Sequence, residues 1–499
     1  MQNPLQILIG RADRLNQEGH AAAAVDMLTK GMQVIPHNKY LIHRLADILC
    51  ENEQYQKALD ILEEPSLDDN DIRSAELKCR CLAGLKRYGA AEAVIDPILT
   101  ADRPSADALN LKGELLFQRH AKQAARLYFE RAIQADPSYG RAYFNLGLMQ
   151  LDQGLGKGAV EILEKGFVLS PHVNQVADTY HDLISELNAY ERAEPLFIDA
   201  CRMYPRNKRL AYLLIDILIR QNKFKEAMDQ IQSAMAAFGV DDGIIEPALR
   251  IRKSLVPANQ DDLEESIALC MIVKNEERHL ARCLASVKNA VREIVIVDTG
   301  SKDRTKDIAE IFGANIYNCE WNRDFSYARN LSISKATADW ILILDADETV
   351  ASSDIGALAK VAQRRNQYAR AYSLVTRNYT NDAGVEGWQA NDGVYSEEEA
   401  GIGWYPSEKV RLFPNKPDIR FENPVHELVE PAIRRAGIPI IKCAVPIHHY
   451  GTLDRVTEIK KRPTTTAWER KKLSLTRRIP PPLSSMRFKR RKWVNIARR

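Results

Sequence analysis

The sequence has no apolar run that approaches the length of a membrane-spanning helix, which is about 20 residues. Its opening residues, MQNPLQILIG, also lack the basic region and hydrophobic stretch that mark a secretion signal. The eight cysteines are scattered along the chain and form no CxxC pair. These absences argue against a membrane span and a secretory signal, and free thiols fit a reducing compartment. We therefore expect a cytoplasmic protein.

Acidic residues are almost absent from the C-terminal end of the chain. Residues 460–499 carry fifteen Lys or Arg and a single acid, so this end has a formal charge of +14 and the preceding chain −11. Such a tail could bind anionic lipid or nucleic acid through its charge. It could equally be an aberrant terminus with no selected role. The abrupt change in charge favours a disordered or aberrant tail over residues 456–499, and we expect no nucleic-acid partner.

Length and internal repetition predict the organisation of the first half. A chain of 499 residues suits two or three domains. Small residues recur every 33 or 34 residues, at Ala24, Ala58, Ala91, Ala125, Ala159, Ala193 and Ala227. A second series, Pro137, Pro171 and Pro205, has the same period. A repeat of this length is typical of helix pairs that stack into a solenoid.

The clearest repeat is ADALNLKGELLFQRHAKQAARLYFERAIQADP, residues 106–137. It resembles the tetratricopeptide consensus at Gly113, Ala125, Phe129, Ala132 and Pro137. The resemblance implies an all-α tetratricopeptide solenoid over residues 1–240. Because the concave face of such solenoids commonly holds an extended peptide or another protein, we expect a peptide or protein partner there. The alternative is an array that only supports or dimerises the neighbouring domain.

The pattern changes after residue 240. Residues 241–266 include VPANQDDLEES, whose proline and acids predict a linker. Short apolar runs then alternate with amphipathic segments, and the runs are IALCMIV (267–273), EIVIVD (293–298) and WILILD (340–345). This alternation predicts an α/β, Rossmann-like domain over residues 267–455, with buried parallel strands and helices on both faces. Ligands of such sheets bind at the carboxyl ends of the strands.

Two carboxylates, Asp345 and Asp347, directly follow the last of these runs. Their emergence from a buried strand is unfavourable without a partner. A hard divalent cation, Mg²⁺ or Mn²⁺, held by these oxygens could bridge the two phosphates of a nucleoside diphosphate and stabilise it as a leaving group. The pair therefore predicts a metal site.

Four segments taken in order, IALCMIVKNEE, IVIVDTGSKDRT, WNRDFSYARN and WILILDADE, resemble the successive motifs of family 2 glycosyltransferases with a GT-A fold. The resemblance covers roughly residues 267–451. It implies a hexosyltransferase-type enzyme that inverts the anomeric centre and takes its sugar from a nucleotide-sugar donor, usually a UDP-sugar. It also implies nucleotide contacts for the matching positions Val273, Glu276, Asp298, Arg329, Asn330 and Asp345, and metal ligation by Asp345 and Asp347.

The resemblance leaves an alternative for Arg329 and Asn330. Beside the nucleotide, a guanidinium could offset phosphate charge. The same two residues could instead serve only to pack their helix against the domain.

An inverting transfer needs a base on the acceptor side of the sugar. Our candidate is Glu427, in RLFPNKPDIRFENPVHELVE, which resembles the stretch of these enzymes that ends in a VHE element. Glu408, Asp392 and the acidic run 397–399 compete with it. His449 is the candidate for a further metal ligand, because related enzymes often use a histidine late in the domain. The alternative for His449 is a buried, hydrogen-bonded imidazole.

Several functions remain open from the sequence. The expected one is sugar transfer to a peptide or protein presented by the repeats. Alternatives are transfer to a lipid-linked or lipopolysaccharide-core saccharide, and a non-catalytic scaffold with an inactive transferase domain. A sugar nucleotidyltransferase is disfavoured, because KNEE follows the first strand where that class has a glycine-rich phosphate loop.

Overall fold

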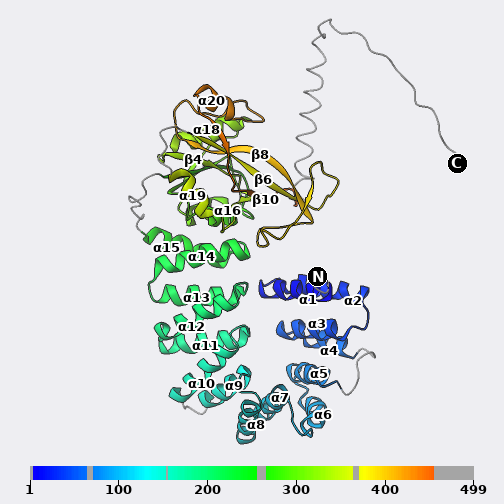
Figure 1. The fold of residues 1–499 in the computed structure, drawn as a ribbon. Coiled ribbons are helices and arrows are strands. Elements are labelled where there is room, and N and C mark those ends of the chain that lie inside the picture. Colours follow the sequence, from blue (N-terminus) through cyan, green and yellow to red (C-terminus); the bar gives the residue numbers. More distant parts are fainter. Residues whose placement is uncertain (1–3, 64–70, 153–155, 256–265, 364–369, 454–499) are drawn as a thin grey trace, which may run out of the picture.

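The computed structural model describes residues 4–63, 71–152, 156–255, 266–363 and 370–453. Within these ranges the chain forms a helical solenoid followed by a sheet domain with helices on both faces (Figure 1). This arrangement confirms the predicted fold class. The predicted basic tail, residues 456–499, lies outside the described residues.

The solenoid is built from consecutive antiparallel helix pairs. Each alanine of the 34-residue series lies in the second helix of a pair and is fully buried, which confirms the repeat. The absence of a larger side chain lets the paired helices approach closely. The helices are α1 (Pro4–Gln17), α2 (Ala21–Val34), α3 (Lys39–Glu51), α4 (Tyr55–Leu62), α5 (Ile72–Gly84), α6 (Tyr88–Leu99), α7 (Ala106–Gln118), α8 (Lys122–Ala135), α9 (Gly140–Asp152), α10 (Gly156–Leu169), α11 (Asn174–Leu187), α12 (Tyr190–Met203), α13 (Lys208–Arg220), α14 (Phe224–Phe238) and α15 (Asp242–Ser254).

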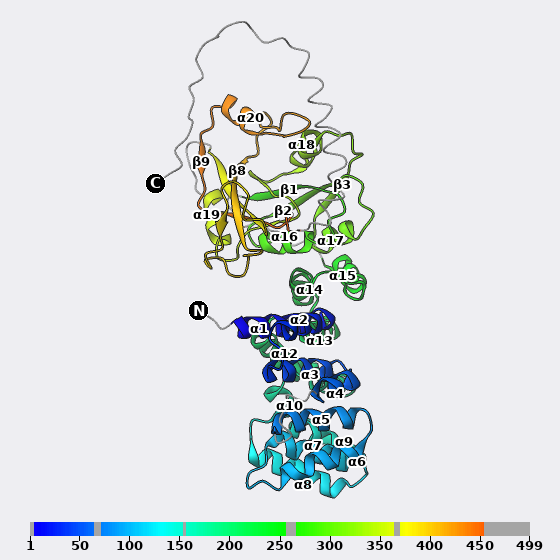
Figure 2. The ribbon, with the colours of Figure 1, turned by 90° about the vertical axis from the view of Figure 1, so that its right-hand side faces the viewer.

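The solenoid bends back on itself, so that its first pair lies beside α13 (Figures 1 and 2). Arg206, in the loop between α12 and α13, places its Nη1 2.9 Å from Glu18 Oε1 at the end of α1. Its Nη2 lies 3.2 Å from Glu397 Oε2 in the sheet domain. A single side chain therefore touches the first repeat, a late repeat and the second domain.

The sheet domain has ten strands in its described part, and eight form the continuous order β3-β2-β1-β4-β8-β6-β10-β5. The neighbouring strands β3, β2, β1 and β4 are parallel, as predicted, whereas β8 runs antiparallel to both β4 and β6. The strands are β1 (Ile267–Val273), β2 (Glu293–Asp298), β3 (Asn315–Asn318), β4 (Trp340–Ile343), β5 (Glu348–Thr349), β6 (Ala371–Thr380), β7 (Gln389–Ala390), β8 (Gly403–Pro414), β9 (Ile440–Lys442) and β10 (Ile447–His449).

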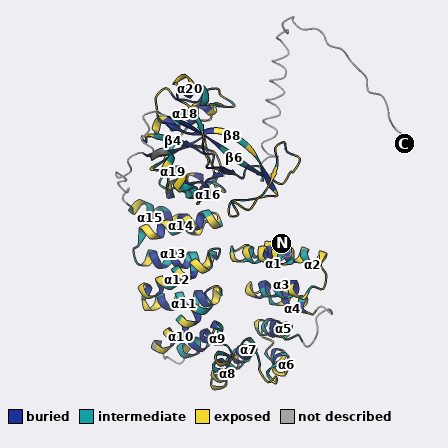
Figure 3. Ribbon diagram, in the orientation of Figure 1, coloured by how far each residue is buried: buried dark blue, intermediate teal, exposed yellow. Residues whose placement is uncertain are grey.

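Helices cover both faces of this sheet. Leu269 and Met271 of β1 belong to one core cluster together with residues of α16 (Leu280–Val287) and α17 (Thr305–Ile311). The alternate residues Ala268 and Cys270 belong to a second cluster, with α18 (Phe325–Lys335) and α20 (Glu430–Arg435). A further helix, α19, spans Ile355–Gln363. Burial on both sides explains why these strands are apolar throughout (Figure 3).

The two parts are packed directly against each other, with α14 on α16 and α15 on α17. Gln232 of α14 donates from Nε2 to the Ile311 carbonyl at 3.0 Å and accepts from Lys288 Nζ at 2.9 Å. One apolar core cluster runs from the late repeats into the sheet domain. The solenoid is thus attached through a shared core as well as through the chain connection.

The predicted linker is wrong over residues 242–254, which form α15. This helix buries Ile244, Ile245, Ala248 and Ile251, whose spacing is helical although the repeat alanine is lost. The proline and acids that suggested a linker come after it. No helix in the described ranges is both long enough and apolar enough to cross a bilayer.

Gly166 tests how closely the helices must pack. A Cβ on Gly166 of α10 would lie 2.9 Å from the Phe144 backbone nitrogen of α9, so relief requires movement of a helix. We expect Gly166→Ala to destabilise the solenoid by roughly 1–3 kcal/mol, measured as a lower urea midpoint. Gly89→Ala is the control, because nothing lies within 4 Å of a Cβ there. Equal midpoints for the two variants would contradict the close approach.

Candidate active site

The carboxyl ends of β2, β1 and β4 meet at one edge of the sheet. Val273 at the end of β1 pairs with Asp298 at the end of β2, and Asp345 follows β4. Val273 and Asp298 are both buried. The Asp298 carboxylate accepts from the backbone nitrogens of Gly300 and Ser301, at 3.2 and 3.1 Å, and so holds the turn after β2. Gly300 has φ +100°, a conformation that favours glycine.

Two loops at this edge are bonded to each other. Asn275 Oδ1 accepts from the Lys302 nitrogen at 2.8 Å, and the Asn275 nitrogen donates to Ser301 Oγ at 2.9 Å. The Glu276 nitrogen donates to Thr305 Oγ1 at 2.8 Å. The segments KNEE and SKDRT therefore order one another, a role that reading them as separate motifs does not reveal.

Three of the sequence motifs meet at the guanidinium of Arg329, on α18. Its Nη2 lies 2.7 Å from Asp345 Oδ1 and its Nε lies 3.0 Å from Glu427 Oε1. The arginine is 6% exposed, whereas the Asp345 and Glu427 side chains are 36% and 19% exposed, so the guanidinium is buried and the two carboxylates keep partial contact with solvent. Burial alone would raise the pKa of the Asp345 carboxyl, but Arg329 and then Arg411 hold it well below its ordinary value.

The neighbouring Asn330 is bonded to protein backbone. Its Nδ2 donates to the Phe421 carbonyl at 2.9 Å, and its Oδ1 accepts from the Phe421 nitrogen at 2.8 Å. Asn330 thereby ties α18 to the segment that leads to Glu427. This geometry gives it a positioning role.

A buried ion pair that the sequence does not predict lies against the turn after β4. Arg411 Nη2 on β8 lies 2.6 Å from Glu348 Oε1, and each residue is 3% exposed. The other oxygen of Glu348 accepts from the Asp345 backbone nitrogen at 2.8 Å. The pair holds the turn that carries Asp345 and Asp347. Glu348 directly follows Asp347 in the sequence, but nothing there links it to Arg411, 63 residues later.

Asp347 and His449 lie side by side. His449 Nε2 is 3.3 Å from Asp347 Oδ2, and its Nδ1 is 2.8 Å from Asn378 Oδ1. Asn378 Nδ2 donates to the Tyr405 carbonyl, which orients the amide and leaves Oδ1 to accept a hydrogen from His449 Nδ1. Burial would lower the pKa of His449, yet the bond to Asp347 raises it overall. A Cβ on Gly451 would collide with Asp347 Oδ2, so glycine leaves room for this carboxylate.

His448 has a different environment. It is fully buried, and its Nδ1 lies 2.8 Å from Tyr379 Oη. Burial lowers its pKa to about 4, so it stays neutral at physiological pH. The two adjacent histidines therefore differ, and only His449 faces the acidic residues after β4.

The side-chain atoms near Asp347 fit a divalent cation whose coordination shell is completed by atoms from outside the protein. In the described residues no cluster of three or more His, Cys, Asp or Glu side chains is arranged for a metal. Asp347 and His449 offer an oxygen and a nitrogen, while Asp345 Oδ1 is engaged by Arg329. Mg²⁺ is commonly held by one or two carboxylates, with phosphate and water oxygens completing its shell. Asp347 and His449 could therefore supply two protein ligands, and the remaining positions would need oxygens from outside the protein.

The loop that carries Glu427 lies against the start of α18. The Phe325 nitrogen donates to the Pro424 carbonyl at 2.9 Å. Left-handed backbone occurs at Arg323, Asn423 and His426, with φ of 68°, 73° and 59°. Such conformations are unfavourable for residues other than glycine and often occur at functional sites.

The competing acids have other partners. Glu408 accepts from Ser373 Oγ and pairs with Lys442, Asp392 pairs with Arg377, and Glu397 pairs with Arg206. Glu399 accepts from the backbone nitrogen of Gly393. Of the candidates, Glu427 is the one that shares a guanidinium with Asp345.

Comparison with protein families divides the chain in the same way. Residues 268–422 match the family model for glycosyl transferase family 2. Residues 82–139, 118–166 and 185–241 match a tetratricopeptide repeat model, and residues 17–98 match the model of anaphase-promoting complex, cyclosome, subunit 3.

Individual relatives resemble parts of the chain. A TPR repeat-containing protein of Synechococcus elongatus is 40% identical over 34% of this chain and 36% of its own length. The SPbeta prophage-derived glycosyltransferase SunS of Bacillus subtilis is 38% identical over 22% of this chain and 27% of its own length. An uncharacterized glycosyltransferase of Rickettsia bellii is 26% identical over 38% of this chain and 66% of that protein. The matches thus span about a third or less of the first two relatives.

Removal of the buried guanidinium tests its role. We expect Arg329→Met to lower the free energy of unfolding by about 3–5 kcal/mol, because Asp345 and Glu427 lose their shared counterion. Arg435→Met is the control, since Arg435 pairs with Glu422 on the surface, where such a pair contributes about 1 kcal/mol or less. Chemical denaturation of both variants measures the difference. Similar losses would mean that the two carboxylates do not depend on Arg329.

Proposed function

We propose that this chain, in which tetratricopeptide repeats precede a glycosyl transferase family 2 domain, transfers a sugar from a nucleotide-sugar donor to an acceptor. The observation that carries the proposal is the convergence of Arg329, Asp345 and Glu427 at the carboxyl edge of a parallel sheet. Ligands of open α/β sheets bind at this edge. In this proposal the Arg329 guanidinium lies between Asp345 on the donor side and Glu427 on the acceptor side.

The donor is proposed to be a UDP-sugar. Val273, Glu276 and Asp298 would contact its nucleoside, because they lie at the ends of β1 and β2 or in the adjoining loop. Arg329 and Asp345 would lie at its phosphates. Asp347 and His449, with Asp345 near them, would hold Mg²⁺ or Mn²⁺. A bound cation supplies positive charge that stabilises the diphosphate leaving group.

Glu427 is the proposed base of an inverting transfer. As the acceptor atom attacks the anomeric carbon opposite the leaving diphosphate, its proton would pass to a Glu427 oxygen. Arg329 Nε donates to one of the carboxylate oxygens, at 3.0 Å. The same guanidinium would orient Glu427 relative to Asp345.

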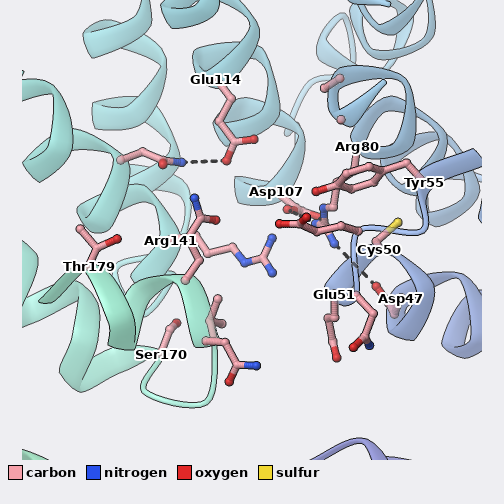
Figure 4. Close-up of a pocket in the computed structure, with 18 of the residues that line it drawn as sticks. Asp47, Cys50, Glu51, Tyr55, Arg80, Asp107, Glu114, Arg141, Ser170 and Thr179 are labelled. Carbon is pink, nitrogen blue, oxygen red and sulfur yellow. Dashed lines mark hydrogen bonds and ion pairs between the residues drawn. The ribbon is translucent and has the colours of Figure 1, made fainter. Parts of the chain in front are cut away.

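The acceptor is proposed to be a peptide or protein held by the solenoid. Its concave side encloses a groove of about 1160 Å³ (Figure 4). One wall carries the ion-paired residues Asp47, Arg80 and Asp107. Arg141 points into the groove from α9, with no bond to another described side chain, so it is available to an acidic or carbonyl group of a partner.

A donor assay tests the enzymatic part of the proposal. We expect release of nucleoside diphosphate from one member of a panel of uridine, guanosine and thymidine sugars with Mn²⁺. Asp347→Asn should reduce this release at least tenfold, because weakened metal sites lose about 10–100-fold in activity.

Asp418→Asn is the matched control, since Asp418 is exposed in the same domain. If wild type releases no diphosphate and calorimetry detects no metal-dependent nucleotide binding, a non-catalytic scaffold is favoured.

A groove variant tests acceptor presentation. Deletion of residues 1–240 would also remove α14, which packs on α16 of the sheet domain. A single substitution in the groove leaves this contact intact. We expect Arg141→Glu to abolish transfer of labelled sugar to protein while donor hydrolysis continues. The control is Arg126→Glu, on the exposed surface of α8, where Arg126 is 58% exposed. Undiminished transfer by Arg141→Glu would exclude presentation through this part of the groove. Labelling of lipid-linked saccharide instead would favour that acceptor.

A further inference from the structure

Two cysteines of neighbouring repeats meet in the wall of the solenoid groove. Cys50 lies on α3 and Cys81 on α5, which are the first helices of consecutive pairs. Their sulfur atoms are 3.3 Å apart, although the residues are 31 positions apart in the sequence. Cys50 lines the groove and is 7% exposed (Figure 4). Cys81 is fully buried.

The surroundings make the two thiols unequal. The hydrogen bond between the two thiols lowers the pKa of Cys50 against the effect of burial, and the Arg80 charge acts in the same direction. The same bond, together with burial, raises the pKa of Cys81. The groove-facing thiol is therefore the one that more readily becomes a thiolate, which is the nucleophilic form.

Cys79 provides an internal comparison on the same helix. It is fully buried, and burial raises its pKa to about 12. Among the described residues it has no sulfur within hydrogen-bonding distance. Within the described part of the chain Cys79 therefore lacks a thiol partner, although it lies only two residues from Cys81.

We propose that Cys50 and Cys81 are a reversible redox site, which a hydroperoxide oxidises to a disulfide. The Cys50 thiolate attacks the O–O bond of hydrogen peroxide and becomes a sulfenic acid, while the other peroxide oxygen leaves as water after protonation. The Cys81 sulfur then attacks the Cys50 sulfur, and the sulfenic oxygen departs as a second water that takes up the Cys81 proton. Two thiols and one peroxide thus give one disulfide and two waters. A low-molecular-weight thiol reverses the step by exchange.

The required movement is small. A disulfide needs a sulfur separation of about 2.05 Å, so the two sulfurs must approach by a little over 1 Å. The same two helices are already joined by Arg73 and Arg80 of α5, which reach Asp47 of α3 at 2.7 and 3.6 Å. Oxidation would add a covalent link beside these ion pairs and fix the spacing of two repeats at the groove wall. This site is independent of the proposed transfer reaction.

Peptide mapping of the full chain tests the proposal. The reduced protein is treated with hydrogen peroxide, quenched with N-ethylmaleimide and digested with trypsin. Cleavage after Arg44, Lys57, Arg80 and Lys86 isolates Cys50 in residues 45–57 and Cys81 in residues 81–86, apart from Cys79. We expect a cross-linked peptide of these two segments that lacks two hydrogens and disappears with dithiothreitol. Cys79→Ala should form the same product to the same extent, and Cys81→Ser should form none.

Three outcomes would overturn the proposal. One is irreversible sulfinic acid at Cys50 with no linked peptide in wild type. Another is a linked peptide that appears only in urea, which would mean that the folded chain does not support the reaction. The third is linkage of Cys50 to Cys79 as often as to Cys81. Wild type and Cys79→Ala carry the test, so it does not depend on the folding of variants at the pair itself.

Discussion

The Arg329 guanidinium lies between Asp345 and Glu427, and the position of each carboxylate depends on it. Without this cation, two acids from distant parts of the chain would be brought together with no counterion between them, and repulsion would separate them. Arg411 and Glu348 extend the arrangement beneath the turn after β4. Alternating charges therefore stabilise the edge of the sheet where donor and acceptor are proposed to meet.

Features that repeat or that follow a strand could be predicted from the sequence. The alanine series predicted the repeated helix pairs, because a small residue recurs where the two helices of a pair pack closely. The acids after β4 were found because a polar pair directly follows an apolar run. The first signal is a repetition along the chain and the second lies within a few residues, so neither requires knowledge of which distant segments meet in the fold.

Contacts between distant segments could not be predicted in this way. Arg411 reads as an ordinary charged residue in a strand, and only the antiparallel pairing of β8 with β4 brings it to Glu348. The contact of Arg206 with Glu18 joins residues 188 positions apart and depends on the accumulated rotation of every repeat between them. Helix α15 was missed because its apolar spacing lacks the alanine that marks the earlier repeats.

The junction between the two parts also limits how they can move. Gln232 is buried and bonded to the Ile311 carbonyl, and the apolar core continues across the boundary. A hinge there would expose this carbonyl and the apolar side chains around it. The solenoid and the sheet domain therefore have a defined relative orientation, unlike domains that are joined only by a flexible linker.

The contact between the first repeat and the α12–α13 loop limits which insertions and deletions the solenoid can accept in evolution. An open array tolerates the gain or loss of a repeat, because each repeat contacts only its neighbours. Here an added or deleted helix pair would rotate Glu18 away from Arg206 and displace the first repeat from its place beside α13. The number of repeats between Glu18 and Arg206 is therefore constrained by closure, as the number of subunits is in a ring.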